Sequence, residues 1–305
     1  MSLEDEMTKV TVIADYGDLC GENPLWDSET RTLYWTDATG ARFYNYRPST
    51  GQHSLLHEGL QINGFTLNRL GGFVVTNNSG IYFWDGQKHI RAVVREIDGR
   101  PCQANDCIAD PSGRLITGTW YYEAGSEYQL GQLIGVETTG RAKVLDEGIH
   151  LANGLGFSPD SSILYFTDSI QRRIYSYDFN VSDGSVRNRR VFVQVPQEEG
   201  IPDGLTVDKD GFVWSAQWYG SCIVRYDPDG RIERRIATPA KQTSSLAFGG
   251  DGFTDIFITT AAKSEVTDAM PPGYDPNSGN FGGALYNINL GIPGRPEFRT
   301  DFPPA

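Results

Sequence analysis

A short phrase recurs six times along this chain, and its spacing limits the possible folds more than any other feature does. Each copy starts with a polar residue, continues with a small or polar one and ends on an apolar one. Successive copies begin 41, 42, 48, 50 and 41 positions apart, and repeats of roughly 40 to 50 residues are typical of β-propeller blades. The copies are Glu22-Asn23-Pro24-Leu25, Asn63-Gly64-Phe65, Asn105-Asp106-Cys107-Ile108, Asn153-Gly154-Leu155, Asp203-Gly204-Leu205 and Ser244-Ser245-Leu246.

Every copy is followed by a turn and then by a run of aromatic and β-branched residues. The turns are rich in Asp, Gly, Pro and Ser, which tight turns favour, and such runs between turns predict strands. The runs are 33–37, 73–77, 115–120, 164–168, 213–218 and 256–260. Two further strands per unit can be followed, as at 173–179 and 190–195. We therefore predict an all-β fold, a six-bladed β-propeller with four-stranded blades.

The two ends of the chain predict how the ring closes. The last unit lacks an outer strand after 284–290, whereas residues 10–14 form a strand with no unit of their own. Pairing them removes an exposed edge, so we predict that the N-terminal strand completes the last blade. Residues 9–305 are then a single propeller domain, preceded by a disordered or vector-derived leader at 1–8. Residues 263–283 form a long insertion in the last blade. A β-sandwich or two stacked β domains is the alternative.

Composition narrows the partners and the location. Lys and Arg total 26 against 39 Asp and Glu, a formal charge of −13, and no basic cluster stands out, which argues against nucleic acid. The N-terminal residues contain no apolar run, so we expect neither a signal peptide nor a membrane anchor, and a cytoplasmic location. Four irregularly spaced cysteines predict buried free thiols. We expect a small-molecule ligand and a monomer or weak homo-oligomer.

The first residues of the six phrases predict a metal site. In a propeller the innermost strands begin near the axis, so these residues surround one channel mouth. Carboxylates and amides at that density suit a hard cation. The four histidines show no ligand spacing, and no G-x-S-x-G phrase supports a serine nucleophile. Turn geometry is the competing explanation for Asn before Gly, for example at Asn63. The six are Glu22, Asn63, Asn105, Asn153, Asp203 and Ser244.

The phrases, taken in order, resemble the senescence marker protein/gluconolactonase/regucalcin family. The resemblance spans about residues 15 to 262. It implies a six-bladed propeller that binds one divalent cation and, in enzymatic members, hydrolyses aldonolactones. The motifs are Glu22-Asn23-Pro24-Leu25-Trp26, Asn105-Asp106 with 110–114, Asn153-Gly154-Leu155, Pro202-Asp203-Gly204-Leu205, 217–220, 224–230 and 243–250.

The same resemblance implies roles for individual residues. Glu22, Asn153 and Asp203 match the metal ligands, and Asp203 also matches the general base. Asn105 and Glu123 match positions that contact the sugar or its water. Calcium is the expected ion, with magnesium, manganese or zinc as alternatives.

One position departs from the family pattern. Gln103 stands where many members have Arg, so a neutral amide would contact the substrate there in place of a cation. Four aromatic residues are expected to form walls, although each one could equally serve blade packing: Trp120, Tyr121, Trp218 and Tyr219.

The resulting hypothesis is a divalent-metal-dependent hydrolase that opens a sugar lactone by attack of water. Two alternatives stay open at this point. One is another calcium-propeller esterase, of the arylesterase or organophosphate hydrolase type. The other is a non-enzymatic calcium-binding propeller, suggested by Tyr34-Trp35-Thr36-Asp37 and its approximate copy at 165–168.

Overall fold

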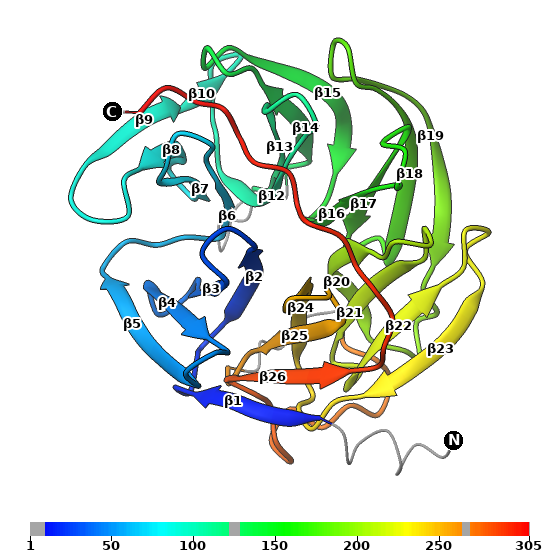
Figure 1. The fold of residues 1–305 in the computed structure, drawn as a ribbon. Helices are drawn as coiled ribbons and strands as arrows, with labels where there is room; N and C mark the ends of the chain where they lie inside the picture. The colour runs from blue at the N-terminus through cyan, green and yellow to red at the C-terminus, as the bar shows by residue number, and fades with distance from the viewer. Residues whose placement is uncertain (1–9, 122–128, 264–268, 305) are drawn as a thin grey trace.

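Six four-stranded antiparallel sheets stand in a ring around a central channel in the computed structural model (Figure 1), which confirms the predicted six-bladed propeller. The structure describes residues 10–121, 129–263 and 269–304. The predicted leader at 1–8 lies outside them.

The first three blades follow one another along the chain, each with its strands in sequence order. Blade 1 is β2 (Gly21–Asp27), β3 (Thr32–Asp37), β4 (Arg42–Arg47) and β5 (Gln52–Glu58). Blade 2 is β6 (Gly64–Leu67), β7 (Phe73–Asn77), β8 (Gly80–Trp84) and β9 (Ile90–Val94). Blade 3 is β12 (Ala104–Ala109), β13 (Leu115–Thr119), β14 (Gly131–Val136) and β15 (Ala142–Ile149), and the short hairpin of β10 (Glu96–Ile97) and β11 (Arg100–Pro101) precedes it.

The next two blades repeat this order, and the last one takes its outer strand from the start of the chain. Blade 4 is β16 (Ala152–Phe157), β17 (Ile163–Asp168), β18 (Arg173–Asn180) and β19 (Ser185–Gln194). Blade 5 is β20 (Ile201–Val207), β21 (Val213–Trp218), β22 (Cys222–Tyr226) and β23 (Ile232–Ala237). Blade 6 is β24 (Thr243–Gly249), β25 (Asp255–Thr260), β26 (Ala284–Asn289) and β1 (Thr11–Asp15).

The N-terminal strand closes the ring, as predicted. β1 pairs antiparallel with β26, with Thr11 opposite Asn287 and Asp15 opposite Ala284. The edge of β26 is thereby covered by a strand from the other end of the chain, which leaves one fewer strand edge open to other molecules.

The repeated phrase lies at or next to the start of each innermost strand. In five of the six blades the pairing between the first and second strands shifts register within the phrase or directly beside it. A β-bulge bends a strand and re-aims its side chains. The repeat therefore marks the point where the chain turns polar groups into the channel.

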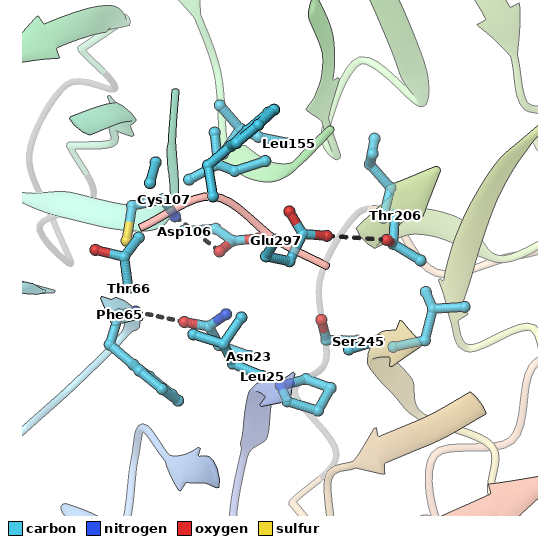
Figure 2. A pocket seen from close by; sticks show the side chains of 17 residues that line it. Asn23, Leu25, Phe65, Thr66, Asp106, Cys107, Leu155, Thr206, Ser245 and Glu297 are labelled. Carbon is cyan, nitrogen blue, oxygen red and sulfur yellow. Dashed lines mark hydrogen bonds between the residues drawn. The ribbon is translucent and has the colours of Figure 1, made fainter. Parts of the chain in front are cut away.

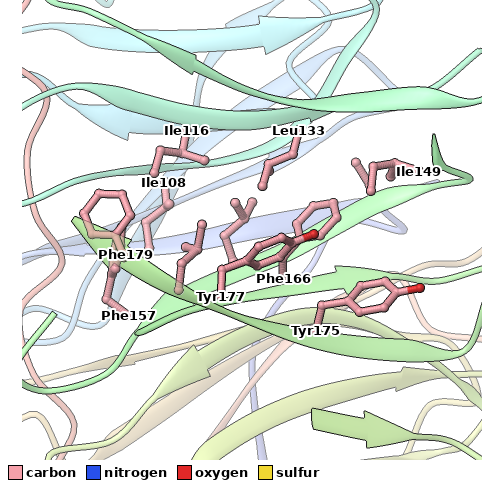
Figure 3. Packing of buried hydrophobic residues seen from close by; sticks show 12 residues of the cluster. Ile108, Ile116, Leu133, Ile149, Phe157, Phe166, Tyr175, Tyr177 and Phe179 are labelled. Carbon is pink, nitrogen blue, oxygen red and sulfur yellow. The ribbon is translucent and has the colours of Figure 1, made fainter. Parts of the chain in front are cut away.

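The apolar core lies between neighbouring blades. Figure 3 shows one such layer, where isoleucine and leucine side chains of blade 3 meet aromatic rings of blade 4. The ring of Phe166 is fully buried there, and the rings of Phe157 and Phe179 meet edge to face at 4.8 Å. Each blade thus covers the apolar face of the next, so the six sheets depend on one another for stability.

The C-terminal tail, residues 290–304, crosses the ring on the face where the innermost strands end, and appears in red in Figure 1. It contacts the turn after the innermost strand of every blade, or the last residues of that strand. These contacts are Gly294 N to Phe253 O (2.7 Å), Lys209 N to Pro293 O (3.0 Å), Arg295 Nη1 to Ser158 O (3.0 Å), Asp301 N to Gly113 O (2.8 Å), Thr300 N to Leu67 O (3.0 Å) and Arg299 Nη2 to Asp27 Oδ1 (2.5 Å). The tail ties the six blades together at one end of the channel.

Three smaller expectations can be compared with the structure. All four cysteines are free, with Cys102 and Cys107 buried and Cys20 and Cys222 partly accessible. The predicted insertion contains no helix or strand in its described residues, 263 and 269–283. Across the described residues, no helix is long and apolar enough to cross a membrane.

Candidate functional site

A cavity of about 320 Å³ lies at the end of the channel where the innermost strands begin. We call it the mouth cavity. Five of the six phrase residues line it: Glu22, Asn63, Asn105, Asn153 and Asp203. The sixth, Ser244, is fully buried and does not. The structure thus brings together side chains that are up to 181 positions apart in the sequence.

The amide and hydroxyl members of this set carry hydrogen bonds between blades. Asn63 donates from Nδ2 to the carbonyl of Ala104 at 3.0 Å, and Asn105 donates from Nδ2 to the carbonyl of Ala152 at 2.7 Å. Each acceptor immediately precedes the phrase of the next blade. Ser244 likewise donates to Gly21 O, which precedes Glu22. These interactions explain Asn and Ser here better than turn geometry does.

Asn153 is held on both sides of its side chain. Its Oδ1 accepts a hydrogen bond from Asn105 Nδ2 at 2.9 Å, and its Nδ2 donates to Ser169 Oγ at 2.9 Å. Ser169 Oγ in turn donates to Pro202 O at 2.7 Å, next to Asp203. Because both ends of the amide have partners, the side chain of Asn153 is held in one orientation.

Glu22 and Asp203 are the two phrase residues without a donor group. Burial raises the pKa of Glu22 well above its ordinary value, and the charges of Asp203 and Asp106 raise it further. Burial also raises the pKa of Asp203 well above its usual range, again with the charge of Asp106. Two buried carboxylates whose charges interact need protons or a cation.

The donor set fits a hard divalent cation. Two carboxylates and the amide oxygens of Asn153 and Asn105 face one cavity, which is the ligand chemistry that calcium and magnesium prefer. In the described part of the chain no three His, Cys, Asp or Glu side chains are placed so that they could hold a metal ion together, so an ion here would need amide or water oxygens too.

Three of the four predicted aromatic wall residues line the mouth cavity: Trp120, Trp218 and Tyr219. Tyr121 does not, and its hydroxyl donates to Pro101 O at 2.9 Å. Other residues that were not predicted also line the mouth cavity, including Ser169, Ile170, Ile201 and the cationic Lys263. Ile201 lies two positions before Asp203, but Lys263 follows the last blade's second strand and carries no sequence signal.

Of the two other predicted substrate contacts, one is absent from the lining of the mouth cavity and the other is not among the described residues. Gln103 is not among its lining residues, and the Gln103 carbonyl accepts a hydrogen bond from Trp120 N at 3.1 Å. Glu123 lies outside the described residues. Contacts of these two side chains with a substrate remain predictions. The Nδ1 atom of His150 lies 3.3 Å from Asp168 Oδ2.

A second, smaller cavity of about 40 Å³ lies farther along the channel, and we call it the inner cavity (Figure 2). The carboxyl of Asp106, from β12, and that of Glu297, from the C-terminal tail, both point into it. Glu297 Oε1 accepts a hydrogen bond from Thr206 at 3.3 Å. Burial raises the pKa of Asp106 to about 7, and the charge of Glu297 adds to the effect. The tail therefore closes the channel behind the mouth cavity with a second acidic side chain.

Residues 20–262 match the sequence pattern of the family described as SMP-30/Gluconolactonase/LRE-like region. This chain belongs to that family. The match runs from just before the phrase of blade 1 to just after β25, so it contains every phrase residue of the channel mouth. The predicted family resemblance is confirmed.

Individual members of the SMP-30/gluconolactonase/LRE-like family resemble the chain over nearly its whole length. The pentonolactonase XacC of Haloferax volcanii is 36% identical over 294 residues, which cover 96% of this chain and 98% of that protein. The 6-deoxy-6-sulfogluconolactonase of Pseudomonas putida is 30% identical and covers 91% of this chain and 93% of its own. The structure of a luciferin-regenerating enzyme superposes with a TM-score of 0.84 at 29% identity, covering 96% of this chain and 99% of the other.

Proposed function

We propose that this protein is a divalent-metal-dependent lactonase that hydrolyses the lactone of a sugar acid in the mouth cavity. The observation that carries the proposal is that Glu22 and Asp203, the two phrase residues whose side chains have no donor group, line the same cavity as Asn153. Relatives named pentonolactonase and 6-deoxy-6-sulfogluconolactonase support the substrate class.

Glu22, Asn153 and Asp203 would hold the cation, with calcium the expected ion. When bound, a divalent cation would supply Lewis acidity to the lactone carbonyl and to the oxyanion that forms from it. The interaction of Asn153 with Asn105 and Ser169 keeps its oxygen in place for this role. Such supporting contacts typically affect metal affinity or activity by about 10- to 100-fold.

Asp203 would accept the proton from the attacking water. Its carboxyl is buried and lies near Asp106, which raises its pKa in the metal-free site, and its affinity for the proton would compete with its bond to the cation. The proton gained by Asp203 would then pass to the ring oxygen as the C–O bond of the lactone breaks, which leaves an open-chain aldonic acid. General-base assistance of this kind contributes roughly 10²- to 10⁴-fold.

The remaining cavity residues would bind the sugar. Asn105 uses both protons of its Nδ2 on Ala152 O and Asn153 Oδ1, so its own Oδ1 is the atom left to accept a bond from a hydroxyl. The rings of Trp120, Trp218 and Tyr219 offer apolar faces to the C–H bonds of a sugar ring. Gln103 and Glu123 complete the predicted substrate contacts, and a cytoplasmic location remains a prediction.

The proposal is tested by assaying pentono- and hexonolactones with a pH indicator in the presence of calcium, magnesium, manganese or zinc. We expect metal-dependent turnover of at least one lactone, and a loss of about 10²-fold or more in Asp203→Asn with an unchanged circular dichroism spectrum. Asp210→Asn, an exposed acid on the β20–β21 turn, is the matched control and should keep wild-type activity.

Three results would contradict the proposal. Full lactonase activity in Asp203→Asn would remove this residue from the mechanism. Turnover of aryl esters but of no lactone would favour the arylesterase or organophosphate hydrolase alternative, and no turnover of either class would favour a non-enzymatic propeller.

A further inference from the structure

A third cavity, of about 530 Å³, shares a lining residue with the mouth cavity, and we call it the side cavity. Its lining is polar, with Glu198 and an ion pair between Arg235 and Glu199 whose Nη2 and Oε2 atoms are 2.6 Å apart. Tyr219 lines both cavities, and no other described residue does. Tyr219 is therefore the residue that the two linings share.

The backbone of Tyr219 is held in an unusual conformation. Its φ is +68°, in the left-handed region that bulky residues rarely adopt. Ser221, two positions later, has a φ of +53°. Gly220, between them, packs so closely on Gly200 and Gln217 that a Cβ atom there would lie 2.7 Å from Gln217 Cβ. The turn between β21 and β22 is therefore fixed against the segment that leads into β20.

The ring of Tyr219 is fixed as well. It is only 6% exposed and meets the ring of Tyr274, from the insertion of blade 6, at a centroid distance of 4.8 Å. Lys241 anchors that insertion, because its Nζ lies 4.8 Å from the centre of the Tyr274 ring and 3.0 Å from Asp275 O. Two elements from different blades thus hold one wall of the mouth cavity.

We propose that Tyr219 restricts the substrate to lactones of a single sugar unit, by separating the mouth cavity from a side cavity that would otherwise hold a glycosyl substituent. The polar lining of the side cavity suits a second, hydroxyl-rich ring, and the two volumes together exceed what one aldonolactone requires. The inference rests on the proposed lactonase function and adds the residue that limits substrate size.

The decisive variant is Tyr219→Gly. Glycine adopts a positive φ without steric cost, so this replacement removes the partition and relieves the backbone at the same position. Tyr219→Phe keeps the ring and is the matched control. Tyr274→Phe keeps the second ring and tests whether the hydroxyl of the insertion residue contributes.

The measurement is the ratio of kcat/KM for an aldobionolactone, such as lactobionolactone, to that for a pentonolactone. We expect the ratio to rise at least tenfold in Tyr219→Gly and to stay within about twofold of wild type in the two Phe variants. An equal loss on both substrates in Tyr219→Gly, or a wild-type protein that already hydrolyses the aldobionolactone as well as the pentonolactone, would overturn the proposal.

Wild-type turnover of the pentonolactone separates this test from that of the proposed function. If the wild type turns over no lactone, the lactonase proposal fails, and titration calorimetry of calcium-loaded protein with aldonates of one and two sugar units still measures the size limit. Binding of the larger aldonate by Tyr219→Gly but not by wild type supports the partition, and binding by neither or by both overturns it.

Discussion

Arg299, in the C-terminal tail, pairs with Asp27 at the end of β2, with 2.5 Å between Nη2 and Oδ1. The two residues are 272 positions apart in the sequence. At the other end of the chain, β1 pairs with β26 of blade 6. The N-terminal strand is thus bound to the last blade and the C-terminal tail to the first. The ring is therefore closed at two places. β1 closes it at the edge of blade 6, and the C-terminal tail closes it across the end of the channel.

The tail is expected to contribute strongly to stability. Phe302 is 1% exposed and packs between blades 2 and 3 with Val74, Leu115 and Ile134. Phe302→Ala should lower the free energy of unfolding by about 3–5 kcal/mol, because it removes buried apolar surface and leaves a cavity. Urea denaturation measures the change. Leu70→Ala, at a side chain that is 63% exposed, is the control and should change stability by less than about 0.5 kcal/mol.

The inner cavity predicts a pH dependence of stability in metal-free protein. The pKa of Asp106 is raised to about 7, by burial and then by the charge of Glu297, whereas an unfolded Asp titrates near ~3.9. Between these two values the folded state keeps a proton on Asp106 that the unfolded state has released. The stability that protonated Asp106 contributes is fully present below about pH 4 and is lost as the pH rises to about 7. Asp106→Asn should flatten the fall in stability over that interval, measured by urea unfolding at several pH values with a chelator present.

Glu297→Gln is the companion variant for the inner cavity. It removes the charge that helps to raise the pKa of Asp106, so the fall in stability should become smaller without disappearing. A pH profile identical to that of wild type in both variants would show that the two carboxyls do not share the inner cavity in solution.

Cation binding at the mouth should release protons. Because burial raises the pKa of both Glu22 and Asp203, the metal-free site keeps protons to a higher pH than free carboxyls do, and a cation must displace them. Calcium titrations at pH 7 in buffers of different ionisation enthalpy should give different heats, and calcium should bind more weakly at pH 5 than at pH 8. Heats that are independent of the buffer would contradict this.

Removing the cation should also lower thermal stability. A ligand at 100 times its dissociation constant stabilises the folded state by about 2.7 kcal/mol. The melting temperature should therefore fall on addition of a chelator in wild type and change little in Glu22→Gln, whose site lacks one of the two carboxylates.

Ser169 is expected to position Asn153. Its hydroxyl accepts from Asn153 Nδ2 and donates to Pro202 O, so it joins blades 4 and 5 beside the site. Ser169→Ala should weaken calcium binding by about 10- to 100-fold, and Ser169→Thr, which keeps the hydroxyl, should restore most of it. Equal calcium affinity in all three proteins, measured by calorimetry, would show that Asn153 needs no such support.

The sequence alone determined the blade number, the innermost strands and the acidic pair. The period of the phrase and the turns behind it are local features, and five of the six blades form from consecutive strands, so the repeat carried enough information. The closure by β1 was also predictable, because residues 10–14 had no other partner and the last unit lacked an outer strand.

Only the tertiary structure decided which polar residues face the cavity and what else surrounds them. Ser244 and Asn153 occupy equivalent positions in the repeat, yet one is buried in a hydrogen bond to Gly21 and the other faces the mouth cavity. The tail at 290–304, Glu297 in the inner cavity and Tyr219 between two cavities follow no period. Their roles depend on contacts between segments far apart in sequence, and for that physical reason no local pattern could predict them.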